Sequence, residues 1–510
     1  MTLAVSQRVP SKYDPNRITD IARSVERALN PALQKISDWI DVKADYGAKG
    51  DGSTDDTNAF SAAISDVAAG GAVVFPCGKY VGVVSVRKSN VTLIFEGCTI
   101  TQPDSTDYPA VLEFGDLASG NSATAYSQIN VVGQVLLDGN KSGITTPSDD
   151  LTGWGFACTK ISNSDFGNGI RVTNCYNGGV GILIDSNYNK GAFYVESCGN
   201  ATYTGPGFDI NSSKYCVFDF VSKSCYTGAR LLDNCYGNNI RGSVYNSTAD
   251  GLVYNNQTTN SSYANNIDVT VYTAGQHGIN LQYNSMRTNI RASVYDATEI
   301  GAVIGFSASY PCSNLNIDLV TSNSGAQGLL LKVGGEDNII RHQSYLDGRT
   351  GSQGTSYAVD VYGDRNKLLV DLIDSSTWQV RGVNFRSGAT DNELLSYSYT
   401  NTADPLSDSG TRTKINHGQG RGVDIASAST ITLPALGTIF HITGTTNIDT
   451  MAGSGGTDQF ITLIFDDILT VTKGSNLKLG AGGDFVSTAD STLSGVWDGT
   501  NFYETGRSVT

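Results

Sequence analysis

The stretch NNIDVTVY at residues 265–272 recurs in close variants along the chain, as NNIRGSVY at 238–245 and TNIRASVY at 288–295. Apolar and polar residues alternate within each stretch, which predicts β-strands. Each stretch begins with a small polar residue followed two positions later by Ile or Leu, and such starts recur every 23 to 28 residues. A repeat of this length indicates a solenoid. The starts are Asn238, Asn265, Thr288, Ser313, Asn338, Asn366 and Asn392.

A second apolar stretch follows in most repeats, often after a glycine, as in GLVY at 251–254 and GINL at 278–281. The leucine and asparagine skeleton of leucine-rich repeats is absent. We therefore predict an all-β fold, a single-stranded right-handed parallel β-helix of about a dozen coils over residues ~73 to ~405. At ~4.8 Å per coil the rod is on the order of 60 Å long, with apolar side chains inside and asparagines at the corners.

The composition excludes several classes of protein. Glycine accounts for 58 of 510 residues and charged residues for only 16%, which favours many short strands joined by turns. Hydrophobic residues make up 39%, too many for a disordered chain. The formal net charge is −15, so we expect no nucleic-acid partner. No apolar run approaches the ~20 residues that span a bilayer, and no signal peptide is evident, so we expect no membrane insertion.

The nine cysteines include no CxxC pair and no zinc spacing. We expect buried free thiols, and no metal or cofactor. Cys175, Cys198 and Cys225 follow a strand end in three successive coils, which predicts a stack of small side chains at one corner.

The N-terminal segment, residues 1–41, is predicted to be helical. Apolar residues recur at helical spacing between Pro15 and Ile40, with an interruption at Pro31. A lone amphipathic helix cannot bury its apolar stripe by itself. Two interpretations stay open, an attachment or assembly segment and a helix that packs on the neighbouring domain.

Residues 45–60 read DYGAKGDGSTDDTNAF, and Phe60, Ala63, Ile64 and Val67 continue as a helical stripe. The glycines permit tight turns, and AVVFP at 72–76 begins a strand. This stretch resembles the opening of the pectate-lyase-like right-handed β-helix proteins, in which it precedes a short helix that caps the first coil. The resemblance implies a domain over residues 42–405, and a structural role for the motif.

The C-terminal region changes character. Residues 406–422 are rich in turn residues and predict a linker, and residues 423–510 predict a small antiparallel β-domain. ITGTTNI at 442–448, LIFDDILTVTKGSNL at 463–477 and WDGTNFYE at 497–504 resemble the C-terminal modules of bacteriophage tailspikes and tail fibres. The resemblance implies that this module is a trimerisation or receptor-type module and that the protein is a homotrimer.

One outer face of the rod is predicted to carry ladders of side chains. If Ile267 and its equivalents point inward, Arg241, Asp268 and Arg291 point outward. Tyr245, Tyr272 and Tyr295 follow four residues later, and Tyr345 and Tyr399 occupy the matching place in later coils. We consider two roles equally, a sugar-binding surface built from Tyr245, Tyr272, Tyr295, Arg241 and Arg291, and a subunit contact.

Glycoside hydrolysis usually needs two carboxyl groups. Asp209 and Asp233 follow one another in neighbouring coils and are the predicted acid/base pair. Their Cα atoms are ~8 Å apart if Gly207 aligns with Ala229 and ~5 Å apart if the two aspartates align, so the stereochemical outcome stays open. Asp250, His277 and Glu299, roughly one per coil, form a second candidate group.

Together these resemblances imply a phage tailspike of the virion tail, made in the bacterial cytoplasm and acting outside the host cell. Its N-terminal segment would join the phage tail or another tail protein. It would bind and cleave a bacterial surface polysaccharide, that is a capsule, an O-antigen or an exopolysaccharide, by endo-acting hydrolysis. The alternatives are a polysaccharide lyase, for which Tyr272, His277 and Arg291 provide candidate groups, and a non-catalytic adhesin. The polygalacturonase motifs and the calcium pectate lyase aspartate cluster are absent, so pectin is not supported as the substrate.

Overall fold

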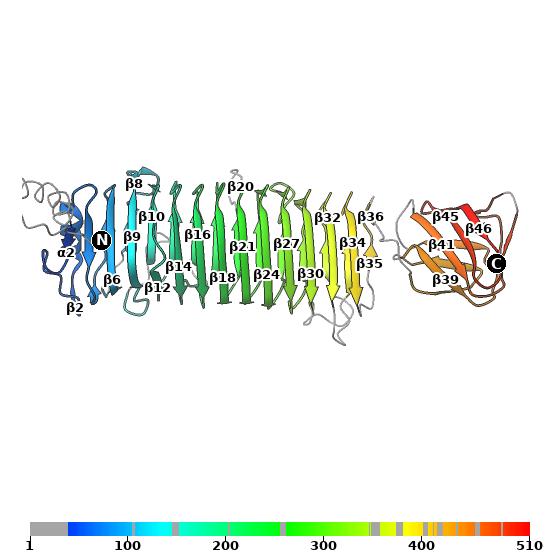
Figure 1. The fold of residues 1–510 in the computed structure, drawn as a ribbon, viewed down its shortest axis with the longest axis horizontal. Coiled ribbons are helices and arrows are strands. Elements are labelled where there is room, and N and C mark those ends of the chain that lie inside the picture. The colour runs from blue at the N-terminus through cyan, green and yellow to red at the C-terminus, as the bar shows by residue number, and fades with distance from the viewer. Residues whose placement is uncertain are drawn as a thin grey trace, which may run out of the picture.

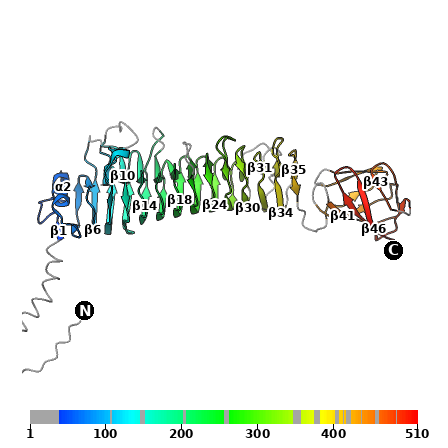
Figure 2. The same ribbon diagram turned by 90° about the horizontal axis from the view of Figure 1, so that it is seen from above.

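The computed structural model describes residues 39–104, 108–144, 152–201, 205–255, 262–345, 347, 357–373, 381–400, 406–411, 413–415, 422–434, 437–453, 459–480 and 483–509. These residues form a long rod and a small β-module, which lie at opposite ends of the view in Figure 1. The rod is a right-handed-type parallel β-solenoid of about 16 turns with almost no helix, which confirms the predicted β-solenoid. Seen from above, the strands of the rod stack in parallel rows along its axis (Figure 2).

The first of these rows is a 17-stranded sheet, which carries the recurring NxI stretches. Its neighbouring strands pair in parallel, and Ile240, Ile267 and Ile290 are in register with one another and buried inside the rod. The strands are β1 (Trp39–Asp41), β2 (Asp51–Asp55), β3 (Ala72–Phe75), β4 (Lys79–Val81), β6 (Val91–Thr101), β9 (Ile129–Asp138), β12 (Ile170–Thr173), β14 (Lys190–Glu196), β16 (Val217–Lys223), β18 (Asn239–Ser247), β21 (Asn266–Ala274), β24 (Asn289–Ala297), β27 (Asn316–Ser322), β30 (Ile339–Tyr345), β32 (Lys367–Ile373), β34 (Glu393–Thr400) and β36 (Lys414–Ile415).

The second row is a 13-stranded parallel sheet built from the apolar stretches that follow the glycines. Small sheets complete some corners: β8 (Tyr126–Ser127) pairs with β11 (Ile161–Ser162), and β20 (Ser262–Tyr263), β23 (Ser285–Met286), β26 (Cys312–Ser313) and β29 (Gly335–Glu336) form a third row. The strands of the 13-stranded sheet are β5 (Val84–Val86), β7 (Ala110–Phe114), β10 (Trp154–Thr159), β13 (Gly178–Leu183), β15 (Pro206–Asn211), β17 (Thr227–Leu232), β19 (Leu252–Asn255), β22 (Ile279–Gln282), β25 (Ala302–Ile304), β28 (Leu329–Leu331), β31 (Tyr357–Val361), β33 (Arg381–Phe385) and β35 (Leu406–Asp408).

The rod begins with the motif at residues 45–60 and a short helix, α2 (Thr57–Asp66). Phe60, Ala63 and Ile64 on this helix are buried, as the helical stripe predicts. Asp56, itself buried, accepts hydrogen bonds from the backbone nitrogens of Lys49 at 2.6 Å and Gly50 at 3.0 Å, which ties the turn to the helix. The motif is therefore structural here, as its resemblance implied.

Most of the predicted N-terminal helix, residues 1–38, lies outside the described residues. Its last two apolar positions, Trp39 and Ile40, are in strand β1 and not in a helix. The strand forms because Trp39–Asp41 pairs in parallel with Ala72–Val74 of β3. The helical assignment of those two residues was therefore wrong.

A glycine column sits at the corner that leads into the 13-stranded sheet. A Cβ built on Gly278 would lie 2.2 Å from Val294 Cγ1 of the long sheet, and one on Gly251 would lie 2.5 Å from Val271 Cγ1. A side chain has no room at this close approach, which explains why glycine precedes the second strand in the repeats.

A buried asparagine column closes the corner that precedes the long sheet. Asn265 Oδ1 accepts from the backbone nitrogen of Asn238 at 2.9 Å, and Asn392 Oδ1 accepts from that of Asn366 at 2.9 Å. The side-chain nitrogens donate to carbonyls of the turn, as Asn338 does to Cys312 at 3.1 Å. This confirms that the recurring asparagines satisfy corner backbone groups, which explains their fixed place in the repeat.

The interior is apolar along the rod, and Cys175, Cys198 and Cys225 are buried free thiols within it. Burial is the largest cause that raises the pKa of Cys198 well above its usual value, so this thiol is protonated. The three cysteines follow strands β12, β14 and β16 in successive coils, as predicted.

The rod extends beyond its expected end at residue 405. Strand β35 (Leu406–Asp408) pairs with β33, and β36 (Lys414–Ile415) pairs with β34, so both strands, which lie within the expected linker, belong to the last coil. At the other end, β1 pairs with β3, so the rod also begins before its expected start at residue ~73.

The C-terminal module has its own core, which includes Phe440, Leu463 and Trp497. It is not purely antiparallel as predicted. Strand β39 (Ile439–Thr443) pairs in parallel with β37 (Ile425–Ala426) and with β41 (Gln459–Phe465), and β43 (Leu477–Lys478) pairs in parallel with β46 (Phe502–Ser508). Strand β45 (Ser491–Trp497) pairs antiparallel with β41 and with β46. Its strands are β37 (Ile425–Ala426), β38 (Thr430–Leu433), β39 (Ile439–Thr443), β40 (Thr450–Gly453), β41 (Gln459–Phe465), β42 (Thr470–Val471), β43 (Leu477–Lys478), β44 (Phe485–Val486), β45 (Ser491–Trp497) and β46 (Phe502–Ser508).

Candidate functional site

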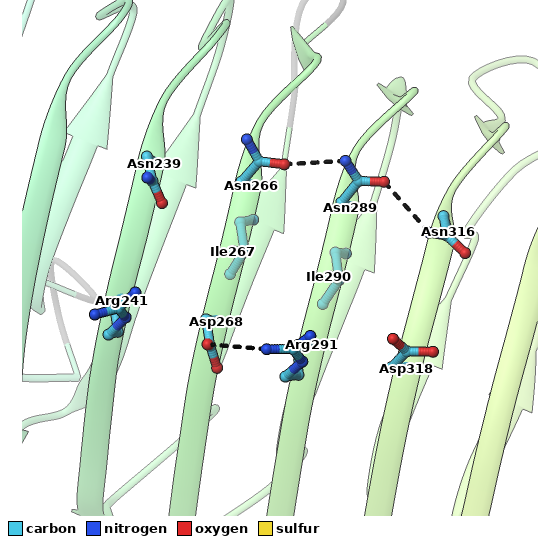
Figure 3. A pocket seen from close by; sticks show the side chains of 10 residues that line it. All are labelled: Asn239, Arg241, Asn266, Ile267, Asp268, Asn289, Ile290, Arg291, Asn316 and Asp318. Carbon is cyan, nitrogen blue, oxygen red and sulfur yellow. Dashed lines mark hydrogen bonds and ion pairs between the residues drawn. The ribbon is translucent and has the colours of Figure 1, made fainter.

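The outer face of the long sheet carries a column of strictly alternating charge. Strand pairing brings Arg241, Asp268 and Arg291 side by side, and Arg241 and Arg291 flank Asp268 in Figure 3. An arrangement of this kind avoids like charges on adjacent strands. The full column runs Asp219, Arg241, Asp268, Arg291, Asp318 and Arg341.

A shallow groove of about 270 Å³ lies over this column. Asp268 Oδ2 is 3.8 Å from Arg291 Nη1, and Asn266 Oδ1 accepts from Asn289 Nδ2 at 3.0 Å, as the dashed lines in Figure 3 show. Arg241 has no ion-pair partner within 4.0 Å among the described residues, whereas Arg291 and Arg341 in the same column are each paired with an aspartate. The groove is lined by Asn239, Arg241, Asn266, Ile267, Asp268, Asn289, Ile290, Arg291, Asn316 and Asp318.

The predicted tyrosine ladder lies further along the same strands. The rings of Tyr245 and Tyr272 stack with centroids 4.8 Å apart and planes 6° apart, and those of Tyr272 and Tyr295 stack at 5.3 Å and 13°. Stacked rings cover each other's faces, so this ladder presents mainly ring edges and hydroxyl groups to a ligand. A sugar therefore has little room to stack on these ring faces within the ladder.

Of the two later tyrosines assigned to this column, one lies in it and the other does not. Tyr345 is in register with Ser322, the residue that follows Tyr295 in the column, so it belongs there. Tyr399 pairs with Leu372 and not with Ile373, the column position. A bulge after Leu368 shifts the register by one residue, so the placement of Tyr399 in the column was wrong.

The second candidate group is brought together by the turns that follow the tyrosines. Asp250 Oδ1 accepts from the backbone nitrogen of His277 at 3.1 Å, and Asp250 Oδ2 accepts from Asn280 Nδ2 at 2.9 Å. His277 Nδ1 lies 3.5 Å from Glu299 Oε2. The Glu299 side chain is 52% exposed and that of His277 is 18% exposed, so a half-exposed carboxylate meets a partly exposed imidazole.

Asp209 and Asp233 are not brought together as the carboxylate-pair hypothesis expected. Phe208 aligns with Ala229, so Asp209 lies directly opposite Arg230, and Asp233 comes three residues later in the turn after β17. Asp209 is 1% exposed and makes a bidentate ion pair with Arg230, at 2.7 and 3.2 Å. A carboxylate held in this way is a structural ion-pair partner and a poor proton donor.

A second tyrosine stack, which the sequence reasoning missed, lies at the corner before the long strands. Tyr188 and Tyr215 stack at 4.9 Å, and Tyr236 and Tyr263 stack at 4.8 Å. Their spacing of 21 to 27 residues is a signal that the repeat analysis could have used, but only after the corner positions were aligned.

Another feature that the sequence left open is the pairing of Asp360. This buried carboxylate accepts two hydrogen bonds from Arg386, at 2.7 and 2.8 Å, and one from Asn384 at 2.9 Å. Asp360 is therefore a second structural ion-pair partner on the 13-stranded sheet.

No group of three or more His, Cys, Asp or Glu side chains that could hold a metal ion occurs among the residues that the structure describes. Within the same residues, no helix has the length and apolar character needed to cross a membrane.

These sheets and corners define a parallel β-solenoid protein. Residues 39–253 match the family described as Rhamnogalacturonase A/epimerase, pectate lyase-like, so this part of the chain is a pectate-lyase-like domain, as the motif at residues 45–60 implied. None of the curated proteins matches the chain.

Several solved structures are similar to the chain. The A-module of the mannuronan C-5 epimerase AlgE6 of Azotobacter vinelandii has 17% identity and a TM-score of 0.42, and the match covers 74% of this chain and 100% of that one. The N-terminal fragment of bacteriophage Phi29 gene product 12 has 17% identity, a TM-score of 0.46 and coverages of 83% and 80%. The ORF18 protein of Geobacillus virus E2 has 12% identity, a TM-score of 0.42 and coverages of 98% and 80%.

Proposed function

We propose that this chain is a tailspike-type protein that binds and cleaves a bacterial surface polysaccharide by glycoside hydrolysis. The C-terminal motifs at 442–448, 463–477 and 497–504 support the tailspike part of the proposal. In this proposal the C-terminal module joins three copies, and the N-terminal segment attaches them to the phage tail. The pectate-lyase-like domain supports action on a polysaccharide, because its family description names a rhamnogalacturonase.

One observation carries the cleavage part of the proposal: three successive coils each place a charged residue and a tyrosine on the outer face of the long sheet, and an acid or base in the turn that follows. The tyrosines are in register, and the acid/base groups follow each of them by four or five residues and contact one another. A glycan that crosses these coils from the outer face of the long sheet to the following turns would meet donors, hydroxyls and acid/base groups. The three sets are Arg241, Tyr245 and Asp250; Asp268, Tyr272 and His277; and Arg291, Tyr295 and Glu299.

The roles within this group follow from exposure and bonding. Both oxygens of Asp250 accept hydrogen bonds, so it positions the coil of His277 and does not itself transfer a proton. Glu299 is the exposed carboxylate, and the His277 imidazole, a side chain that commonly serves as a general acid or base, lies 3.5 Å from it. We assign proton transfer to the glycosidic oxygen and activation of water to these two side chains, as hydrolysis requires.

The test is incubation of the full-length chain with a panel of purified capsular polysaccharides, O-antigens and exopolysaccharides. New reducing ends without ultraviolet absorbance of an unsaturated sugar indicate hydrolysis, which is the expected result. Reducing ends with that absorbance indicate a lyase, and the hydrolytic proposal is then wrong.

A non-catalytic adhesin is the second candidate, and a specific observation favours it. The outward carboxylates of Asp268 and Asp318 are paired with arginines at 3.8 and 3.0 Å, and Asp209 is held by Arg230. Paired charges of this kind suit recognition better than proton transfer. Binding to a panel polysaccharide without any cleavage would establish the adhesin in place of the enzyme.

A further inference from the structure

An outward row of the 13-stranded sheet is polar in the coils of Asp209 and Arg230, and again in the coil of His277, where it holds Asn280. In register along this row, Ala157 and Gly181 come before the polar stretch, and Val303 and Leu330 come after it. Between them the row contains Asp209, Arg230, Val253 and Asn280. Two apolar residues separate this polar stretch from the polar residues further along the row, Asp360 and Asn384.

A relay of three amides starts from Asp250 within this stretch. A carboxylate only accepts hydrogen bonds, so Asn280 must present Nδ2 to Asp250 Oδ2, at 2.9 Å. The Oδ1 of Asn280 then accepts from Gln282 Nε2 at 3.0 Å, and the Oε1 of Gln282 accepts from Asn255 Nδ2 at 3.4 Å. Asp250 thus fixes the direction of each amide along the relay.

The relay ends in an acceptor that has no donor. Asn255 is 8% exposed, and among the described residues its Oδ1 is a buried atom without a hydrogen-bond partner. The amide cannot turn over to relieve this, because its nitrogen is needed by Gln282. A buried acceptor left without a donor is unfavourable, so a donor from outside the described residues is expected at this position.

We propose that Asn255 Oδ1 is the acceptor of a subsite that binds a hydroxyl group of a sugar, and that the relay links it to Asp250 of the candidate acid/base group. This inference rests on the proposed function, because the polysaccharide supplies the hydroxyl. A neutral hydroxyl fits better than an anion, since the relay starts at the Asp250 carboxylate and presents an oxygen at Asn255. Asn255 is then a residue that determines specificity.

The experiment uses the full-length chain and six methyl glycosides as probes, those of glucose, galactose, mannose, rhamnose, N-acetylglucosamine and glucuronic acid. Binding is followed by saturation-transfer NMR and by crystal structures of soaked wild-type crystals. The variant is Asn255→Leu, which removes the acceptor. The matched control is Asn384→Leu, because Asn384 donates to Asp360 at 2.9 Å in the same sheet but outside the polar stretch.

We expect at least one glycoside to bind the wild type with a hydroxyl on Asn255 Oδ1. Asn255→Leu should weaken this binding about tenfold, and Asn384→Leu should stay within about threefold of the wild type. Soaked crystals in which only water meets Asn255 Oδ1 overturn the proposal, and so does an equal loss in Asn255→Leu and Asn384→Leu. The crystal structures decide the question even if Asn255→Leu fails to fold.

Polysaccharide cleavage measured in parallel separates this subsite from the proposed function. An Asn255→Leu chain that cleaves with an unchanged KM overturns the subsite alone. A wild-type chain that neither binds nor cleaves any panel polysaccharide overturns the proposed function, while the glycoside measurement still gives its own answer.

Discussion

Replacing Thr321 by valine should destabilise the middle of the rod, because its hydroxyl joins two buried polar groups. Thr321 lies in register with Val294, in a column that points into the core. Its hydroxyl donates to Asp347 Oδ2, so His342 Nε2, 2.8 Å away, must carry a proton and donate to Thr321 Oγ1. Burial lowers the pKa of His342 to about 3 and raises that of Asp347, so the ring is neutral.

The magnitude follows from the groups left behind. Thr321→Val keeps the shape but leaves His342 Nε2–H without an acceptor, which costs about 1–3 kcal/mol. It also removes one of the hydrogen-bond donors to Asp347, and the loss of this bond to a carboxylate adds about 1.5–3 kcal/mol. Asp347 still accepts from Ser344 Oγ at 2.5 Å and from Ser324 N at 2.8 Å. We expect a total loss of about 2.5–6 kcal/mol.

Thr321→Ser is the matched control, since it keeps the hydroxyl and loses one methyl group, about 0.8 kcal/mol. Solenoids open locally, so the assay is native-state hydrogen exchange of the amides in β27 and β30, supported by denaturant unfolding. Equal losses in the valine and serine variants would refute this reasoning, because the hydroxyl would then contribute nothing.

Three further predictions concern stability. Asp209→Asn should lower the free energy of unfolding by about 3 kcal/mol, because it breaks a buried ion pair. Asp318→Asn, in an exposed pair, should lower it by about 0–1 kcal/mol, and equal losses in denaturant unfolding would contradict this. Gly278→Ala should lower stability by about 1–3 kcal/mol through overpacking, whereas Gly506→Ala, with nothing within 4 Å of its Cβ, should leave the melting temperature unchanged. The folded pKa of His342 lies below its unfolded value of ~6.5, so the free energy of unfolding falls as pH falls from ~6.5 towards 3. His342→Leu should remove up to ~1.4 kcal/mol per pH unit of this pH dependence. The same pH dependence of the free energy of unfolding in the variant and the wild type would disprove this.

The repeat determined most of what could be predicted from the sequence. Alternation with a period of two fixes which side chains point outward, so the register of Arg241, Tyr245 and their equivalents followed once the asparagine starts were aligned. The same alignment placed Asp250 and His277 in neighbouring coils, and the structure brings them into contact. These inferences succeeded because the intervening strands have equal length.

The remaining errors come from single-residue shifts and from side-chain directions. The pair of Asp209 and Asp233 depended on aligning Gly207 with Ala229, and the structure aligns it one residue earlier. A slip of one residue moves a side chain to the other face of a strand, and composition gives no warning of it. The bulge that displaced Tyr399 is of the same kind. The amide relay could not be foreseen, because the direction of each amide depends on its partner.

The most direct test of the account compares Glu299→Gln with Glu336→Gln on the panel polysaccharide that the wild type cleaves fastest. Glu336 is a suitable control because its carboxylate pairs with Arg365 on a different corner of the rod, at 2.7 Å. The account predicts that Glu299→Gln lowers kcat/KM by about 10²–10⁴-fold with unchanged thermal stability, while Glu336→Gln stays close to the wild type. Wild-type activity in Glu299→Gln, or equal losses in the two variants, would contradict the assignment of cleavage to these three coils.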